Sequence, residues 1–426
     1  MNNTHRPWAW VPTLYFAEGL PYVMVMTVSV IMYKNLGVSN SDIAFYTSWL
    51  YLPWVIKPLW SPLVDLTRTK RWWITAMQLL LGASLAGVAL TLPAPGFFRW
   101  TLILFWLMAF ASATHDISAD GFYMLALPEK EQSLFVGLRS IFYRIAMIAG
   151  QGGLVYLAGR LMNRPGGDPV RAWTLVTGGT AALFMGLAAY HMAVLPKAEE
   201  PRRAERSGLS LKGLLTGFFQ KKNIVVSLLF ILLYRLGEAQ LSKIASPFLL
   251  DDRAAGGLGV SVQDVGVLYG TIGVTALLAG GLLGGVCAAR WGLKRCLWWM
   301  VGAMNLPNLV YVWMACTQPE NLTVIASCIA FEQLGYGFGF TAFMLYLMYM
   351  SQGPYQTSHY ALCTGFMALG MMIPGMFSGV IQEWLGYSRF FVWVCLCTLP
   401  GIALAAFLKI DPAYGREDRK GKEESL

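Results

Sequence analysis

The sequence predicts an all-α membrane protein with twelve transmembrane helices arranged as two six-helix bundles. Composition is the first reason, because 13% of the 426 residues are charged and 56% are hydrophobic, whereas soluble proteins carry about 25% charged residues. The second reason is a series of apolar runs long enough to cross a bilayer, and the third is an internal repeat. We expect spans near residues 8–33, 41–63, 72–93, 98–126, 132–159, 171–195, 224–250, 262–288, 296–316, 322–350, 358–383 and 389–409.

The two halves of the chain carry the same short motif before a span. Leu-Gly-Val-Ser, two further residues and an aspartate occur at 36–42 and again at 258–264. A pair of basic residues follows each motif at nearly the same spacing, at 70–71 and 294–295. Asp42 and Asp264 are expected to be the N-caps of the helices that follow. This repeat predicts that one six-helix unit is present twice.

The domain organisation follows from the apolar runs and the charged stretches between them. We expect a first bundle over residues 1–195, a cytoplasmic linker over 196–223, a second bundle over 224–410 and a polar cytoplasmic tail over 411–426. Within the linker, Ser210–Phe219 is predicted to form a short amphipathic helix on the membrane surface.

The distribution of lysine and arginine predicts the orientation in the membrane. If the N-terminus is inside, 20 of the 32 basic residues flank the spans on the cytoplasmic side and seven on the other. Cytoplasmic loops carry an excess of basic residues, so both termini are predicted to be cytoplasmic. The net charge of +9 reflects this topology, and we expect no nucleic-acid partner.

Sequence motifs for a metal site or for catalysis are absent. The seven cysteines lie between Cys287 and Cys397 without a CxxC motif, and HExxH, HxxxH and GxSxG do not occur. We therefore predict no metal, no cofactor and no enzyme activity. A metal bound by His115, Asp116 and Asp120 in an intramembrane enzyme is the alternative reading, and a non-transporting membrane receptor or sensor is another.

The loops after the second and eighth spans resemble the gating loop of the major facilitator superfamily. In that family an aspartate and then basic residues follow a turn and brace the cytoplasmic gate. The matching residues in the first half are Asp65, Arg68, Lys70 and Arg71, and those in the second half are Arg290, Lys294 and Arg295, with Ala289 where the aspartate would stand. The resemblance implies this family's fold and a secondary transporter that works as a monomer.

Residues 14–150 resemble the AmpG-type permease branch of that family more closely. Ala17–Pro21, Val55–Asp65, Ser112–Asp120 and Tyr143–Met147 look like that branch's motifs ASGLP, FKFLWSPLxD, SATQDIxxDA and GYRLGM. The resemblance implies proton-coupled import of an anionic solute such as an anhydro-muropeptide across the bacterial inner membrane. Glu18 stands where a small residue is usual and His115 where Gln is usual, so a siderophore, an acyl-CoA or another organic anion remains an alternative substrate.

In this fold, spans 1, 4, 7 and 10 line the central cavity, and each carries ionisable residues here. A charge in the hydrocarbon core is costly, so such residues usually face a partner or water. Proton coupling is assigned to Glu18, Asp116 and Glu332. Glu18 has no cation within one turn of its own helix, so burial favours the neutral form of its carboxyl. Solute binding is assigned to Lys57, Tyr143, Arg144, Arg235 and Glu238.

Two ion pairs are predicted from depth in the hairpin of spans 4 and 5. That hairpin turns near residues 129–130, so Asp120 is level with Arg139, and Asp116 is level with Arg144. We predict that the Asp120–Arg139 pair is a structural clamp and that the Asp116–Arg144 pair serves function. Asp116 and Asp120 lie on one helical face. A proton or substrate relay and a purely structural clamp are both compatible with this pattern.

Overall fold

The computed structural model describes residues 7–127, 129–197, 211–353, 356–412 and 414, and this part of the chain is helical, without a strand. Two compact units are present. Unit 1 comprises residues 1–208, 243–251 and 259–271, and unit 2 comprises 209–242, 252–258 and 272–426. Each unit thus contains helices from one predicted bundle, and unit 1 also takes in two short segments around residue 255.

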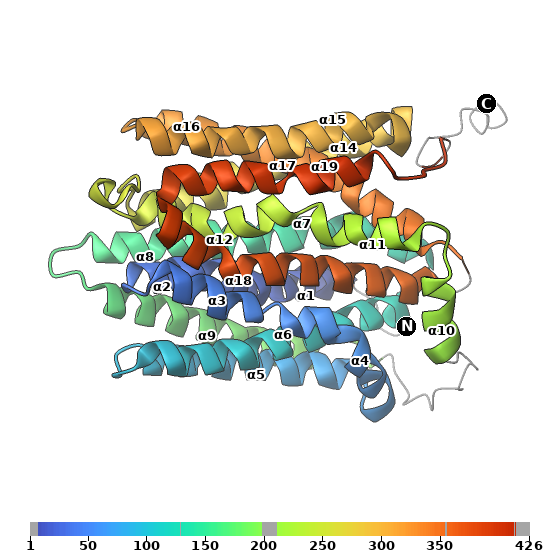
Figure 1. Cartoon of the computed structure of the whole chain (residues 1–426). Coiled ribbons are helices and arrows are strands. Elements are labelled where there is room, and N and C mark those ends of the chain that lie inside the picture. The colour runs from blue at the N-terminus through green and yellow to red at the C-terminus, as the bar shows by residue number, and fades with distance from the viewer. Residues whose placement is uncertain (1–6, 128, 198–210, 354–355, 413, 415–426) are drawn as a thin grey trace, which may run out of the picture. The chain divides into compact units, whose positions relative to one another are not determined.

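Unit 1 is built from long apolar helices that lie against one another. In Figure 1, α5 runs beside both α6 and α9. The elements of this unit are α1 (Pro7–Val23), η1 (Met24–Val28), α2 (Ser29–Asn35), α3 (Asn40–Trp49), α4 (Leu52–Thr67), α5 (Lys70–Thr91), α6 (Phe97–Ala126), α7 (Glu129–Met147), η2 (Ile148–Leu154), α8 (Val155–Met162), α9 (Pro169–Val194) and α13 (Val262–Val265).

Unit 2 contains α14 and α17 packed side by side, with α15 along the same α17. Two elements, α12 (Leu236–Leu250) and the π-helical η4 (Gly266–Gly273), begin in one unit and end in the other. The remaining elements are α10 (Leu211–Phe219), α11 (Ile224–Leu233), η3 (Arg253–Ala255), α14 (Val274–Trp291), α15 (Leu293–Asn305), η5 (Leu306–Asn308), α16 (Leu309–Thr317), α17 (Leu322–Ser351), α18 (Gln356–Cys397) and α19 (Leu399–Ala405).

Eight helical stretches of the described chain are long and apolar enough to cross a membrane. They cover nine of the twelve predicted spans, because His359–Ala405 contains both the eleventh and the twelfth. That stretch turns at Gly386, whose φ of 72° is easily reached by glycine. The other three predicted spans correspond to α3 with α4, to α15 through α16, and to α17.

The repeated motif has the same local structure in both copies. The Ser39 and Ser261 hydroxyls accept hydrogen bonds from the backbone N–H of Asp42 and Asp264, each at 3.1 Å. The serines are therefore the N-caps, and our assignment of the two aspartates as caps was wrong. Each aspartate lies three residues later, at the position of the acidic residue in a capping box, and accepts a hydrogen bond from the same serine hydroxyl.

The predicted linker helix exists as α10, but it packs into unit 2. Phe218 is fully buried and stacks on Phe366, while Phe219 is exposed. Lys221 follows the helix and donates hydrogen bonds to the carbonyls of Met350 and Gln352. Residues 198–210 of the predicted linker lie outside the described residues.

Three π-helical segments interrupt the long helices. They are η1, η2 and η4, in the first, fifth and eighth predicted spans. In α1, Pro21 lacks the N–H that would bond to residue 17, and η1 begins three residues later. Such bulges are frequent at functional sites, and η1 and η2 contact each other.

Candidate functional site

Five charged residues of unit 1 converge from four helices on one half-buried cluster. We call Glu18 (α1), Lys57 (α4), Asp116 and Asp120 (α6) and Arg139 (α7) the acid cluster. Lys57 Nζ pairs with Asp116 Oδ2, and Arg139 pairs with Asp120 at 3.1 Å. The Asp120–Arg139 pair is the one predicted from depth in the hairpin, and it is confirmed.

Aromatic rings hold the Arg139 end of the cluster. The Tyr15 hydroxyl donates a hydrogen bond to Asp120 Oδ1 at 3.2 Å. The Arg139 guanidinium lies 4.8 Å from the centre of the Tyr15 ring and 5.4 Å from that of Tyr123. Both distances are within the range of cation–π attraction. Arg139 is thus fixed by a carboxylate and two rings, as expected of a structural clamp.

Glu18 joins the other end of the cluster through a carboxyl–carboxyl contact. Its side chain is hydrogen-bonded to that of Asp116, and its Oε2 atom is buried without a hydrogen-bond partner among the described residues. A carboxylate only accepts hydrogen bonds, so this contact requires one proton between the two groups. The cluster thus brings three carboxyl groups and two cations together.

The predicted Asp116–Arg144 pair is wrong. Asp116 takes Lys57 as its cation, and the Arg144 guanidinium lies against the Met147 sulfur at 3.9 Å. Depth in a hairpin does not specify the direction around the helix, and consecutive residues point about 100° apart. Tyr143, one residue earlier, lies within electrostatic range of both Glu18 and Asp116.

A buried polar chain beside the acid cluster was not predicted. His115 Nε2 lies 2.9 Å from Gln78 Nε2, and Gln78 Oε1 lies 2.8 Å from His191 Nδ1. His191 Nε2 in turn lies 3.0 Å from the Thr13 hydroxyl. These side chains come from α6, α5, α9 and α1, and the first three are fully buried. This series of side-chain contacts connects the helices that carry Asp116 and Glu18.

Unit 2 has its own cluster of polar residues, on α12 and the turn before it and on α16 and α17. Arg235 donates a hydrogen bond to the Tyr336 hydroxyl and lies 4.9 Å from the centre of the Phe340 ring. Glu238 lies within electrostatic range of Arg235 and of Glu332. Glu332 is 1% exposed and is hydrogen-bonded to Tyr311. These contacts bring together the three unit 2 residues that the sequence assigned to the site.

The predicted gating residues lie in the last turns of α4 and α14 and in the residues that follow them. Arg68 lies over the Trp72 ring, at 5.7 Å, Lys70 is buried, and Arg71 donates a hydrogen bond to the carbonyl of Met192. The side chain of Asp65 lies outside what the structure describes. In unit 2, Arg290 lies over Trp291, at 5.5 Å, and Arg295 is exposed.

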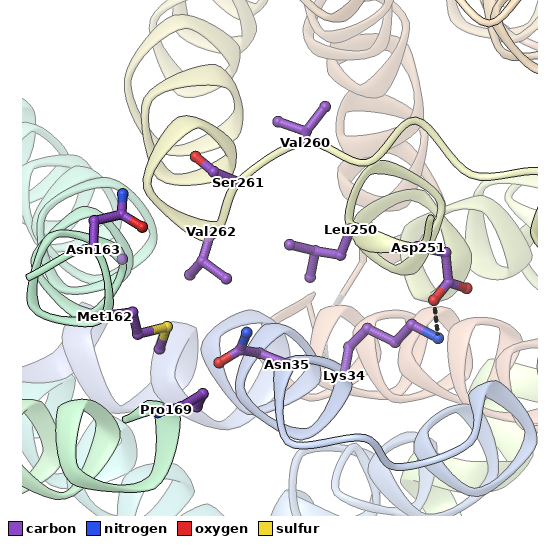
Figure 2. A pocket seen from close by; sticks show the side chains of 11 residues that line it. Lys34, Asn35, Met162, Asn163, Pro169, Leu250, Asp251, Val260, Ser261 and Val262 are labelled. Atoms are coloured by element: carbon purple, nitrogen blue, oxygen red, sulfur yellow. Dashed lines mark ion pairs between the residues drawn. The ribbon is translucent and has the colours of Figure 1, made fainter. Parts of the chain in front are cut away.

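A cavity of about 370 Å³ lies at the other end of the first predicted span. Lys34 is one of the residues that line it, and Figure 2 shows this lysine in an ion pair with Asp251, at 2.6 Å. Asn35, Asn163 and Ser261 are among its polar lining residues. Lys34 is sixteen residues from Glu18 on one helical stretch, or about 24 Å at 1.5 Å per residue. This cavity is therefore separate from the acid cluster.

Comparison with known proteins places the chain among transporters. The chain is 28% identical over 415 residues to the anhydromuropeptide permease of Escherichia coli (strain K12), covering 95% of this chain and 80% of that protein. It is 25% identical over 411 residues to putative transporter AmpG 4 of Rickettsia conorii, covering 93% and 94%.

Solved structures show the same fold at low sequence identity. The nucleoside transporter NupG has a TM-score of 0.71 at 16% identity, covering 94% of this chain and 98% of its own. The D-xylose-proton symporter has a TM-score of 0.72 at 11% identity, covering 96% and 99%. The family model of the Major Facilitator Superfamily matches residues 13–354. This twelve-helix membrane chain therefore belongs to the major facilitator superfamily and is a secondary transporter rather than an enzyme.

Proposed function

We propose that the protein imports an anionic solute of the anhydromuropeptide class together with protons, across the bacterial inner membrane. Two relatives that each match more than 90% of the chain support this substrate class, since one is an anhydromuropeptide permease and the other a putative AmpG transporter. The observation that carries the proton coupling is that the carboxyls of Glu18 and Asp116 approach within hydrogen-bonding range, and we propose that they share one proton.

The coupling works through Lys57. Asp116 is the closer partner of this lysine, so the shared proton resides on Glu18, which donates to Asp116. When the proton moves on to Asp116, the carboxylate that holds Lys57 is neutralised. The ammonium is then available to an anionic solute, which binds most favourably when the proton is bound. A proton and an anion therefore travel in the same direction.

The other site residues have roles that follow from their surroundings. Tyr143, Arg144, Arg235 and Glu238 contact the solute, and Glu332 is a second carboxyl able to carry a proton. Asp120 and Arg139 brace the acid cluster, while Asp65, Arg68, Lys70, Arg71, Arg290 and Arg295 brace the cytoplasmic ends of the helices. The bundles over 1–195 and 224–410 alternate in access around a central site, with both termini cytoplasmic. The protein acts as a monomer.

The substrate class is tested by counterflow in proteoliposomes that contain the full chain. Vesicles are loaded with one unlabelled solute, and entry of a labelled trace of the same solute is measured. We expect exchange of an anhydro-muropeptide and none of a ferric siderophore, an acyl-CoA, a nucleoside or D-xylose. Exchange of the siderophore or the acyl-CoA alone would replace the proposed substrate. Binding of the anhydro-muropeptide without exchange would indicate a receptor.

A further inference from the structure

Lys243 is a buried lysine to which neither the acid cluster nor the unit 2 cluster contributes a partner. It belongs to α12, and 2% of the residue is exposed. Among the described residues, no carboxylate forms an ion pair with it, and none contributes an electrostatic interaction to it. Lys34, in the same unit, shows the usual arrangement, since it pairs with Asp251 at 2.6 Å.

The surroundings of Lys243 satisfy part of its bonding capacity. Its Nζ donates a hydrogen bond to the Thr47 hydroxyl at 2.9 Å, and the Thr47 hydroxyl itself donates to the carbonyl of Ile43 at 2.6 Å. The hydroxyl therefore turns a lone pair toward the ammonium. Nζ also lies 5.3 Å from the centre of the Tyr51 ring. An ammonium has three N–H donors, and within the described chain one of them has a hydrogen-bond partner.

An arrangement of this kind is costly unless a ligand completes it. Removing an ammonium group from water costs roughly several kcal/mol, unless a counter-charge and further hydrogen bonds compensate for the lost hydration. Ionisable residues inside spans of membrane proteins are accordingly rare and mark substrate or ion pathways. The compensation by Thr47 and Tyr51 is neutral. The missing partner of the Lys243 ammonium cannot be a second cation, because like charges repel. A carboxylate supplies both a negative charge and hydrogen-bond acceptors.

We infer that Lys243, Thr47 and Tyr51 form a subsite that binds a carboxylate of the transported solute. This inference rests on the proposed function and adds the ligand group and the residues that recognise it. Lys57 is held by Asp116 until a proton arrives, whereas Lys243 has no carboxylate to release among the residues that the structure describes. The subsite therefore recognises the anion whatever the protonation of the acid cluster, and it makes the transporter selective for acids over their neutral derivatives.

The subsite is tested by equilibrium binding to the purified full-length chain. The probes are a tritiated anhydro-muropeptide with free peptide carboxyls and the same compound with those carboxyls amidated. We expect the wild type to bind the acid at least ten times more tightly than the amide. In Lys243→Met most of this preference should disappear, with affinity for the amide changed less than twofold. Lys243→Arg should keep most of the preference.

Two further variants separate recognition from a structural tether. Thr47→Val removes the hydrogen bond but leaves the charge, so a preference for the acid should remain. Lys34→Met removes a lysine that has its own carboxylate and should leave the preference unchanged. If Lys243→Met is not monodisperse on gel filtration, Lys243→Gln takes its place in the comparison.

The possible results distinguish this inference from the proposed function. If Lys243→Met keeps the preference for the acid, or if Thr47→Val weakens the binding of both probes as much as Lys243→Met does, the subsite is refuted while the transporter stands. If the wild type binds neither probe, the proposed substrate class fails and the subsite fails with it.

Discussion

The pairing of Lys57 with Asp116 is the contact on which the proposed mechanism depends. Lys57 comes from α4, Asp116 from α6, and the side chain of Glu18 reaches the same carboxylate from α1. Removing one partner of an ion pair leaves an uncompensated charge, whereas removing both partners does not. Stability and transport should therefore respond differently to single and double substitutions.

We predict that Lys57→Gln lowers the melting temperature of the purified protein more than the double variant with Asp116→Asn does. The single change strands Asp116 beside Glu18, while the double change leaves neutral groups of similar shape. Thermal unfolding in detergent, followed by intrinsic tryptophan fluorescence, measures the difference. Additive losses in the double-mutant cycle would show that the two residues do not interact.

The sequence predicted these residues better than it predicted their partners. Glu18, Asp116 and Arg139 could be identified because a charged residue in an apolar span is costly. That cost depends only on the type of residue and on its position in the sequence. The partner of Asp116 depends on rotation around two helices and on the reach of a lysine from a third. The series of side-chain contacts that links His115, Gln78, His191 and Thr13 was missed for a similar reason. Nothing in the sequence around Gln78 or His191 shows that four helices bring these side chains together.

At the scale of helices, glycines allow the closest contacts in unit 1. A Cβ on Gly270 would lie 2.0 Å from the backbone nitrogen of Gly152, and a Cβ on Gly159 would lie 2.2 Å from that of Gln263. Neither neighbour is a flexible side chain that can move aside. Small residues at helix contacts in membranes permit such close approach. The glycine-rich fifth span thus packs against the beginning of the eighth.

We predict that Gly270→Ala lowers the melting temperature and the yield of folded protein, because backbone must shift to admit the methyl group. Gly153→Ala is the matched control, since a Cβ there meets nothing within 4 Å. Gel filtration and thermal unfolding of the two variants test this. Equal behaviour of the two variants would show that the η4–η2 contact is not as close as described.

Helix interruptions were harder to predict than the helices. The sequence predicted one span over 41–63, but α3 ends at Trp49 and α4 begins at Leu52, with Pro53 in its first turn. The ninth span is similarly broken by η5, which contains Pro307. Hydropathy gives the length of an apolar run, whereas the break depends on where the chain can replace the hydrogen bonds that a proline removes.

At the scale of the whole molecule, the orientation remains a prediction from the basic residues. We expect Lys222→Cys to be labelled by a membrane-impermeant maleimide from the cytoplasmic side only, and Arg164→Cys from the opposite side only. Arg164 is exposed and Lys222 lies in the short turn before α11, and the native Cys316, also exposed, is first replaced by serine. Labelling of intact and permeabilised cells measures the two sides. Labelling of Lys222→Cys in intact cells would reverse the topology.

The fold class and the duplication were predictable because both rest on patterns that recur along the chain. Twelve apolar runs and two copies of one capping motif required no knowledge of side-chain contacts. The extent of the units was less predictable, since residues 243–251 and 259–271 follow the predicted linker and yet belong to unit 1. Which parts of a duplicated chain pack together depends on surfaces, and the repeat does not reveal those.

The central claim is that Glu18 carries the proton that drives uptake. Proteoliposomes with an alkaline interior and an acidic exterior, supplied with labelled anhydro-muropeptide, test it with the wild type and Glu18→Gln. We predict that the wild type accumulates the solute above the outside concentration and that Glu18→Gln does not, while counterflow by the variant persists because exchange requires no net proton movement. Accumulation by Glu18→Gln that still depends on the proton gradient would contradict the account and assign the proton to Asp116 or Glu332.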